Sequence, residues 1–132
     1  MSHDDFNQQP ILIQDIMARA LISVNTSTTA LQIAKMMEQG GIGAIIVKEN
    51  DTPKGIVTDR DFATKIAANN LSFDTAAEKI MSSPLITINH NEPISAAAER
   101  MTSKKIRKLA VTENGKIIGL ITSTDLVNQL AK

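Results

Sequence analysis

The segments GIVTDRD (residues 55–61) and GLITSTD (residues 119–125) decide the fold, because they are two copies of one pattern separated by 64 residues. Each copy leads from an apolar, strand-like stretch into Thr-x-x-Asp, a spacing typical of the start of a helix. Outward from these segments the same shift holds without gaps and gives fourteen identities over residues 16–63, including Ile-Met pairs at 16–17 and 80–81. The chain is therefore an internal duplication.

Each repeat predicts the same order of elements. Residues 22–24 and 86–88 alternate as a half-buried strand does. A helix follows, and its apolar residues recur at i, i+3, i+4 and i+7: Ala30, Ile33, Ala34 and Met37, matched by Ile94, Ala97, Ala98 and Met101. The candidates for its N-cap are Ser27, Thr28 and Thr29 in the first repeat and Asn91 in the second. Two more strands and a final helix near Asp61 or Asp125 complete each repeat, the strands being 42–47 with 55–58 and 106–111 with 119–122.

The expected fold class is α+β, with two β-α-β-β-α units packed with pseudo-two-fold symmetry. One unit of about 50 residues buries too little apolar surface to be stable alone, whereas two units can cover each other's sheets. We expect an N-terminal tail at 1–11, a first unit at 12–68, a linker at 69–75 and a second unit at 76–132. A ligand is expected in the cleft between the units.

Composition excludes several classes of function. The 132 residues carry no net charge and include three Phe but no Tyr or Trp, so nucleic-acid binding is not favoured. Cysteine is absent, and His3 and His90 have no metal-ligating neighbours at suitable spacing and are expected to be solvated. The lack of such ligands predicts a protein that holds no metal. No set of nucleophile, base and acid is visible either, which predicts a protein that is not an enzyme. Without a signal peptide or an apolar stretch near the roughly 20 residues of a membrane span, we expect a cytoplasmic protein with no membrane partner.

Each repeat resembles a cystathionine-β-synthase (CBS) domain, and the pair resembles a Bateman module. The resemblance rests on the Ile-Met pairs, on the helix ending at Met37 or Met101, on the strand ending at Val47 or Val111, and on GIVTDRD and GLITSTD. It covers residues 12–131. It implies a regulatory module that binds an adenosine-containing ligand.

The resemblance also implies which residues contact that ligand. The ribose hydroxyls would be held by Thr58 and Asp61 and by Thr122 and Asp125. The adenine would lie against the first and second strands, at Ser23, Val24, Ile42, Ala44, Ile45, Thr87, Ile88, Ile106, Lys108 and Leu109. The sequence departs from the family where a proline is common before the last valine of the second strand, because Ile46 and Ala110 stand there.

The Thr-x-x-Asp spacing has two interpretations. A carboxylate accepts hydrogen bonds from vicinal hydroxyls, which suits ribose. The same spacing is also a capping box, in which the carboxylate accepts the backbone N–H of the threonine. The spacing alone favours the cap, and the tandem arrangement favours the ribose site.

The phosphate-binding candidates are Gly43, Arg60, Lys104, Lys105 and Arg107. The planar guanidinium of an arginine suits phosphate oxygens, and a glycine lets a ligand approach the backbone. A solvated face equally explains the lysines, since cations are also favourable at the end of a helix.

The expected function is a ligand sensor that binds AMP, ADP or ATP, with no obligatory cofactor. Apolar residues beyond the core face of helix 29–40 predict a second buried face, for which the resemblance implies a homodimer. An unidentified effector protein would respond to the ligand. A ligand-free module for dimerisation or docking would have the same fold. The resemblance also implies S-adenosylmethionine or a cyclic dinucleotide as alternative ligands, and the basic residues at 104–108 leave nucleic-acid binding as a further alternative.

Overall fold

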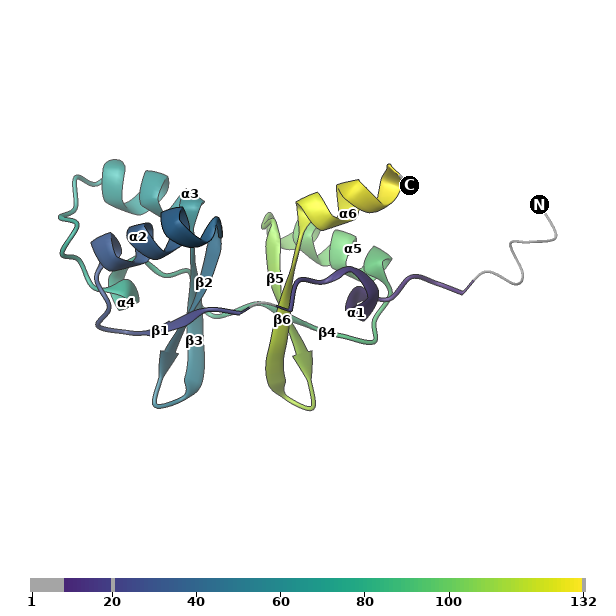
Figure 1. The fold of residues 1–132 in the computed structure, drawn as a ribbon. Helices are drawn as coiled ribbons and strands as arrows, with labels where there is room; N and C mark the ends of the chain where they lie inside the picture. Colours follow the sequence, from purple (N-terminus) through teal and green to yellow (C-terminus); the bar gives the residue numbers. More distant parts are fainter. Residues whose placement is uncertain (1–8, 20, 132) are drawn as a thin grey trace. The chain divides into compact units, whose positions relative to one another are not determined.

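The structure is a computed structural model that describes residues 9–19 and 21–131. It contains two compact units, Leu21–Leu85 and a unit in which Ile86 onward groups with the described residues before Leu21. Each unit is a three-stranded sheet whose helices cover one face (Figure 1). The α+β class and the predicted β-α-β-β-α order are confirmed in both units.

The unit Leu21–Leu85 has the strand order β1-β2-β3, with β1 parallel and β3 antiparallel to β2. Its elements are β1 (Ser23–Asn25), α2 (Ala30–Gly40), β2 (Ala44–Glu49), β3 (Thr52–Thr58), α3 (Asp59–Asp61), η2 (Phe62–Ala67, a π-helix) and α4 (Ala77–Ile80). Alternate residues of β2 pack against α2, α4 and η2, so the core lies between the sheet and these helices.

The other unit repeats this plan with the order β4-β5-β6. Its elements are α1 (Ile13–Ile16), β4 (Thr87–Asn89), α5 (Ile94–Lys104), β5 (Lys108–Glu113), β6 (Lys116–Thr122) and α6 (Ser123–Leu130). Its core joins α1 and α5 to alternate residues of β5 and to β6. No helix in the described ranges is both long and apolar enough to cross a membrane.

The compact units are offset from the two sequence repeats. The short helix α1 precedes the first repeat's strands in sequence, yet Ile13 packs in the core of the unit that holds the second repeat. In the same way α4 packs with the first repeat, where Ala77 and Ile80 are fully buried. The segment expected as a linker also belongs to a unit, because the Phe73 and Thr75 carbonyls accept hydrogen bonds from the first turn of α2.

These backbone contacts explain where the two long helices begin. Thr29, one of the three candidates, is the N-cap of α2, and it forms a full capping box with Gln32. Asn91 was expected to cap α5, and this is wrong, because the N-cap is Pro93. The N–H of Ile94 donates instead to the Ile11 carbonyl, so the second helix needs no side-chain cap there.

Candidate functional site

The clearest polar site in the second repeat is the corner where β6 enters α6. The Thr122 N–H donates to Asp125 Oδ2 at 2.9 Å, and the Asp125 N–H donates to Thr122 Oγ1 at 3.2 Å. This is a complete capping box, so the capping interpretation of the spacing is met in this repeat. The box uses only one carboxylate oxygen, and among the described residues Asp125 Oδ1 has no hydrogen-bond or ion-pair partner. Asp125 is half-buried.

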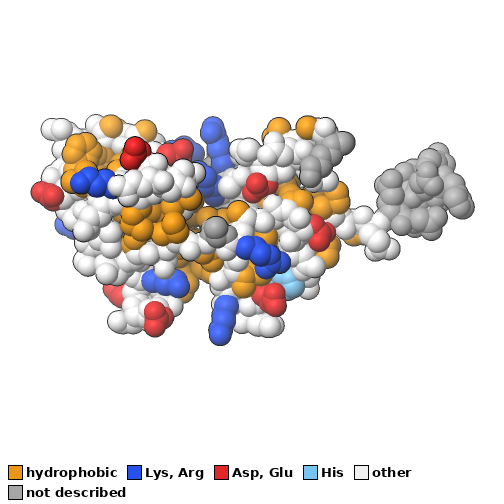
Figure 2. All heavy atoms as spheres, in the orientation of Figure 1, with side chains coloured by type: hydrophobic (Ala, Val, Ile, Leu, Met, Phe, Trp, Pro, Cys, Tyr) orange, Lys and Arg blue, Asp and Glu red, His pale blue; other side chains and the backbone are white. Residues whose placement is uncertain are grey.

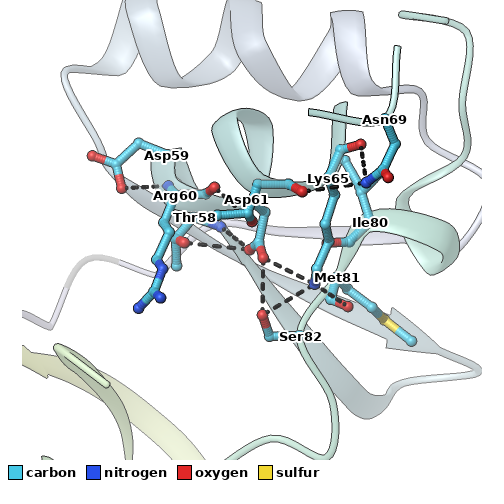
Figure 3. A network of polar contacts seen from close by, with 10 residues as sticks. Thr58, Asp59, Arg60, Asp61, Lys65, Asn69, Ile80, Met81 and Ser82 are labelled. Atoms are coloured by element: carbon cyan, nitrogen blue, oxygen red, sulfur yellow. Dashed lines mark hydrogen bonds and ion pairs between the residues drawn. The ribbon is translucent and has the colours of Figure 1, made fainter. Parts of the chain in front are cut away.

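The equivalent corner of the first repeat, between β3 and α3, uses both oxygens of its carboxylate. The Thr58 N–H donates to Asp61 Oδ2 at 2.8 Å, and Thr58 Oγ1 lies 3.3 Å from the same oxygen. Lys65 Nζ lies 3.0 Å from Asp61 Oδ1, and Ser82 Oγ donates to that oxygen at 2.9 Å. Figure 3 shows these three side chains pointing toward one carboxylate. Asp61 is only 3% exposed.

Positive charge stands beside the second corner. Lys108 is the register partner of Thr122, and the Ser123 N–H donates to the Arg107 carbonyl at 2.8 Å. Both basic residues therefore lie at the start of β5, next to the helix that carries Asp125. In the first repeat the same positions are Gly43 and Ala44, which carry no charge.

The remaining phosphate candidates are exposed. Lys104 ends α5, and Lys105 is its C-cap with a left-handed backbone, a place where cations are favourable without any ligand. Arg60 is exposed beside the first corner. Figure 2 shows Lys and Arg side chains interspersed with Asp and Glu on the visible side of each unit.

The adenine candidates fall into different environments. Ile45, Ile88 and Leu109 are core side chains, at most 2% exposed, so they pack the units. Ile42 and Ile106 are partly buried against those cores. Ala44 is also buried, whereas Thr87 is exposed. Strand alternation explains the split, because a run of strand positions cannot all face one ligand.

Ser23 and Val24 line an open groove of about 740 Å³ between β1 and α2. Its other described residues are Asn25, Thr28, Gln32, Lys35, Met36, Gln39, Lys48, Asn50 and Asp51. The groove contains none of the threonines and aspartates of the two corners. The sequence pattern did not predict this groove, because its walls are the exposed sides of elements that are separate in sequence.

Metal chemistry finds no support in the described part of the chain, where no group of three or more His, Cys, Asp or Glu side chains could hold an ion. His90 was expected to be solvated, but it is partly buried against Gln14 and lies 3.8 Å from Glu113. The Gln14 N–H donates to the His90 carbonyl, and the His90 N–H donates to the Thr112 carbonyl, which places these residues together. His3 lies outside the described residues.

Comparison with known proteins gives one family and several relatives. The model of the CBS domain family matches residues 13–68 and 77–132. An uncharacterized protein of Methanopyrus kandleri is 35% identical over 120 residues, which are 89% of this chain and 61% of that protein. This chain thus spans about three fifths of that relative.

Two solved structures share the fold. The crystal structure of an uncharacterized conserved protein from Pyrococcus horikoshii has a TM-score of 0.88 and 27% identity, covering 95% of this chain and 96% of that one. The CBS domain pair of protein MJ0100, solved in complex with 5′-methylthioadenosine and S-adenosyl-L-methionine, has a TM-score of 0.83 and 25% identity. The likeness to that pair covers 93% of this chain and 98% of the second chain.

Proposed function

The chain belongs to the CBS domain family, and from this premise we propose that it is a regulatory, non-catalytic module that binds an adenosine-containing ligand at the Thr122–Asp125 corner. The observation that carries the proposal is the free Asp125 Oδ1, which stands at the start of α6 beside the basic residues Arg107 and Lys108. A carboxylate suits the ribose hydroxyls, and the cations suit an anionic group on the same ligand.

The ligand class follows from the two kinds of charge at the corner. A solved relative, the CBS domain pair of protein MJ0100, binds 5′-methylthioadenosine and S-adenosyl-L-methionine, which supports an adenosine moiety. Neither of those ligands carries a phosphate, however, whereas this corner has two cations at the start of β5. We therefore propose AMP, ADP or ATP as the ligand, with the phosphate directed toward Arg107.

Isothermal titration calorimetry of the full chain tests the proposal with AMP, ADP, ATP, adenosine and S-adenosylmethionine. We expect phosphorylated ligands to bind more tightly than adenosine, and Arg107→Gln to reduce that preference. Asp125→Asn should abolish binding, because the amide presents a donor where the ribose hydroxyl needs an acceptor. Asp74→Asn, at an exposed loop position, is the control for loss of one carboxylate.

Absence of binding for the whole panel would contradict the proposal and favour a ligand-free docking module. Ligands of the native state raise its stability, so a thermal shift with the same panel should agree with calorimetry. Equal affinity for AMP and adenosine would contradict the role of Arg107. Binding of single-stranded nucleic acid that weakens steeply with salt would favour a nucleic-acid-binding module.

The expected homodimer stays a prediction. Leu31 on α2 is 42% exposed in the single chain, as an apolar contact between copies requires. Sedimentation at micromolar protein should give about twice the chain mass of 14.3 kDa, and Leu31→Glu should reduce it. A concentration-independent monomer would contradict the prediction.

A further inference from the structure

We propose that the first repeat is closed to the ligand by a latch, defined as Lys65, Ser82 and Asp61, so that each chain binds one adenosine ligand, at Asp125. The inference rests on the proposed function and adds to it the number of sites and the residues that set this number. It starts from a difference in hydrogen bonding between two aspartates that occupy equivalent positions in the repeats: both oxygens of Asp61 have partners, whereas among the described residues only Oδ2 of Asp125 does.

In the latch, both oxygens of the Asp61 carboxylate, which a ribose would need as acceptors, already have partners. Asp61 Oδ2 is held by Thr58, and Asp61 Oδ1 is shared between Lys65 Nζ and Ser82 Oγ. All these partners lie in the same compact unit as Asp61. Both carboxylate oxygens are therefore occupied, one of them by an ammonium group, and a ribose hydroxyl would bind only by displacing these partners.

Lys65 is itself fixed in place, which makes the latch more than a surface ion pair. Its ammonium donates to the Ile80 carbonyl at 2.9 Å and to the Met81 carbonyl at 3.0 Å, and it lies 3.3 Å from Ser82 Oγ. Figure 3 shows the lysine reaching from η2 across to the residues that end α4. A ligand at Asp61 would therefore have to displace a cation held by four oxygen atoms.

The second repeat lacks both latch partners. At the 64-residue shift Gln129 stands in place of Lys65 and Ala18 in place of Ser82. Neither residue can offer a cation or a hydroxyl to Asp125, and its Oδ1 is accordingly unpartnered among the described residues. These two replacements therefore account for the difference between the first corner, where the carboxylate is fully bonded, and the second, where one oxygen is left for a ligand.

The experiment is calorimetric stoichiometry on the full chain, with AMP as the probe. We expect one AMP per wild-type chain, no binding by Asp125→Asn, and at most a twofold change in affinity for Asp61→Asn. The double substitution Lys65→Gln and Ser82→Ala copies the second repeat into the first, and it should raise the stoichiometry from one toward two. Lys79→Gln, at an exposed lysine of α4, is the matched control.

The outcomes separate the two proposals. Two AMP molecules per wild-type chain, or loss of binding in Asp61→Asn with a normal circular dichroism spectrum, would overturn the latch and leave the proposed function intact. An unchanged stoichiometry in the double variant would also overturn the latch. If Asp61→Asn does not fold, the single variant Ser82→Ala serves instead and should keep the affinity at Asp125 unchanged. No binding of AMP to the wild type would overturn both proposals.

Discussion

At the scale of single residues, Gly55 and Gly119 allow the backbone of each unit to pack closely against a neighbouring segment. A Cβ at Gly119 would lie 2.5 Å from the Ala18 carbonyl oxygen, and one at Gly55 would lie 2.6 Å from that of Ser82. These carbonyls also take part in the bridges that join the residues just after α1 to β6 and the residues just after α4 to β3. Glycine is required at both positions because any side chain would push these segments apart.

We predict that Gly119→Ala lowers the free energy of unfolding by about 1–3 kcal/mol, the usual cost of overpacking. The new methyl group meets backbone atoms that cannot turn aside. Urea unfolding followed by circular dichroism measures the effect. Gly40→Ala, where the nearest atom is a flexible side-chain carbon at 3.6 Å, is the control and should be neutral or stabilising. Equal effects for the two substitutions would contradict the packing argument.

At the scale of elements, the hydrophobic pattern predicted which segments form strands and helices, because alternation and the i, i+3, i+4 spacing record burial directly. It offered the correct N-cap for α2 but not for α5, because the N–H of Ile94 donates to the carbonyl of Ile11, which is remote in sequence. The spacing Thr58-x-x-Asp61 predicted the corner and its possible role as a cap. It did not predict the latch, because Ser82 is 21 residues from Asp61 and reaches it only through tertiary packing.

The N-terminus of α2 gives a prediction at this scale. Thr29→Ala removes a hydroxyl that accepts the Gln32 N–H, and it should cost about 1 kcal/mol of stability. Thermal unfolding checks this value. Thr102→Ala is the control, since that hydroxyl bonds to a carbonyl within its own helix on the exposed surface, and its loss should be close to neutral. A comparable loss in both variants would contradict the cap.

At the scale of the whole molecule, the duplication in the sequence and the compact units of the structure have different boundaries. The sequence shift of 64 residues defines the repeats, but α1 and α4 each pack in the unit of the opposite repeat. Sequence periodicity could not reveal this exchange. The helices α1 and α4 stand at equivalent places in the two repeats, so the hydrophobic pattern is the same whichever sheet each one packs against.

The exchange predicts which fragment folds. A fragment of residues 21–85 contains every buried residue of its core, including Ala77 and Ile80 of α4. A fragment of residues 12–68 lacks that helix. Residues 69–85, which include α4, supply buried side chains that a repeat of about 50 residues lacks. We therefore predict a cooperative urea transition for 21–85 and none for 12–68, measured by circular dichroism. Cooperative unfolding of 12–68 would contradict the exchange.

Amide chemical shifts can show whether the adenosine ligand binds at Asp125 and leaves Asp61 untouched, as we propose. Titrating AMP into ¹⁵N-labelled full chain should shift the amides of Thr122, Ser123 and Asp125 in proportion to occupancy. The amides of Thr58 and Asp61 should stay in place. Equal shifts at both corners, or shifts at Asp61 alone, would contradict the claim.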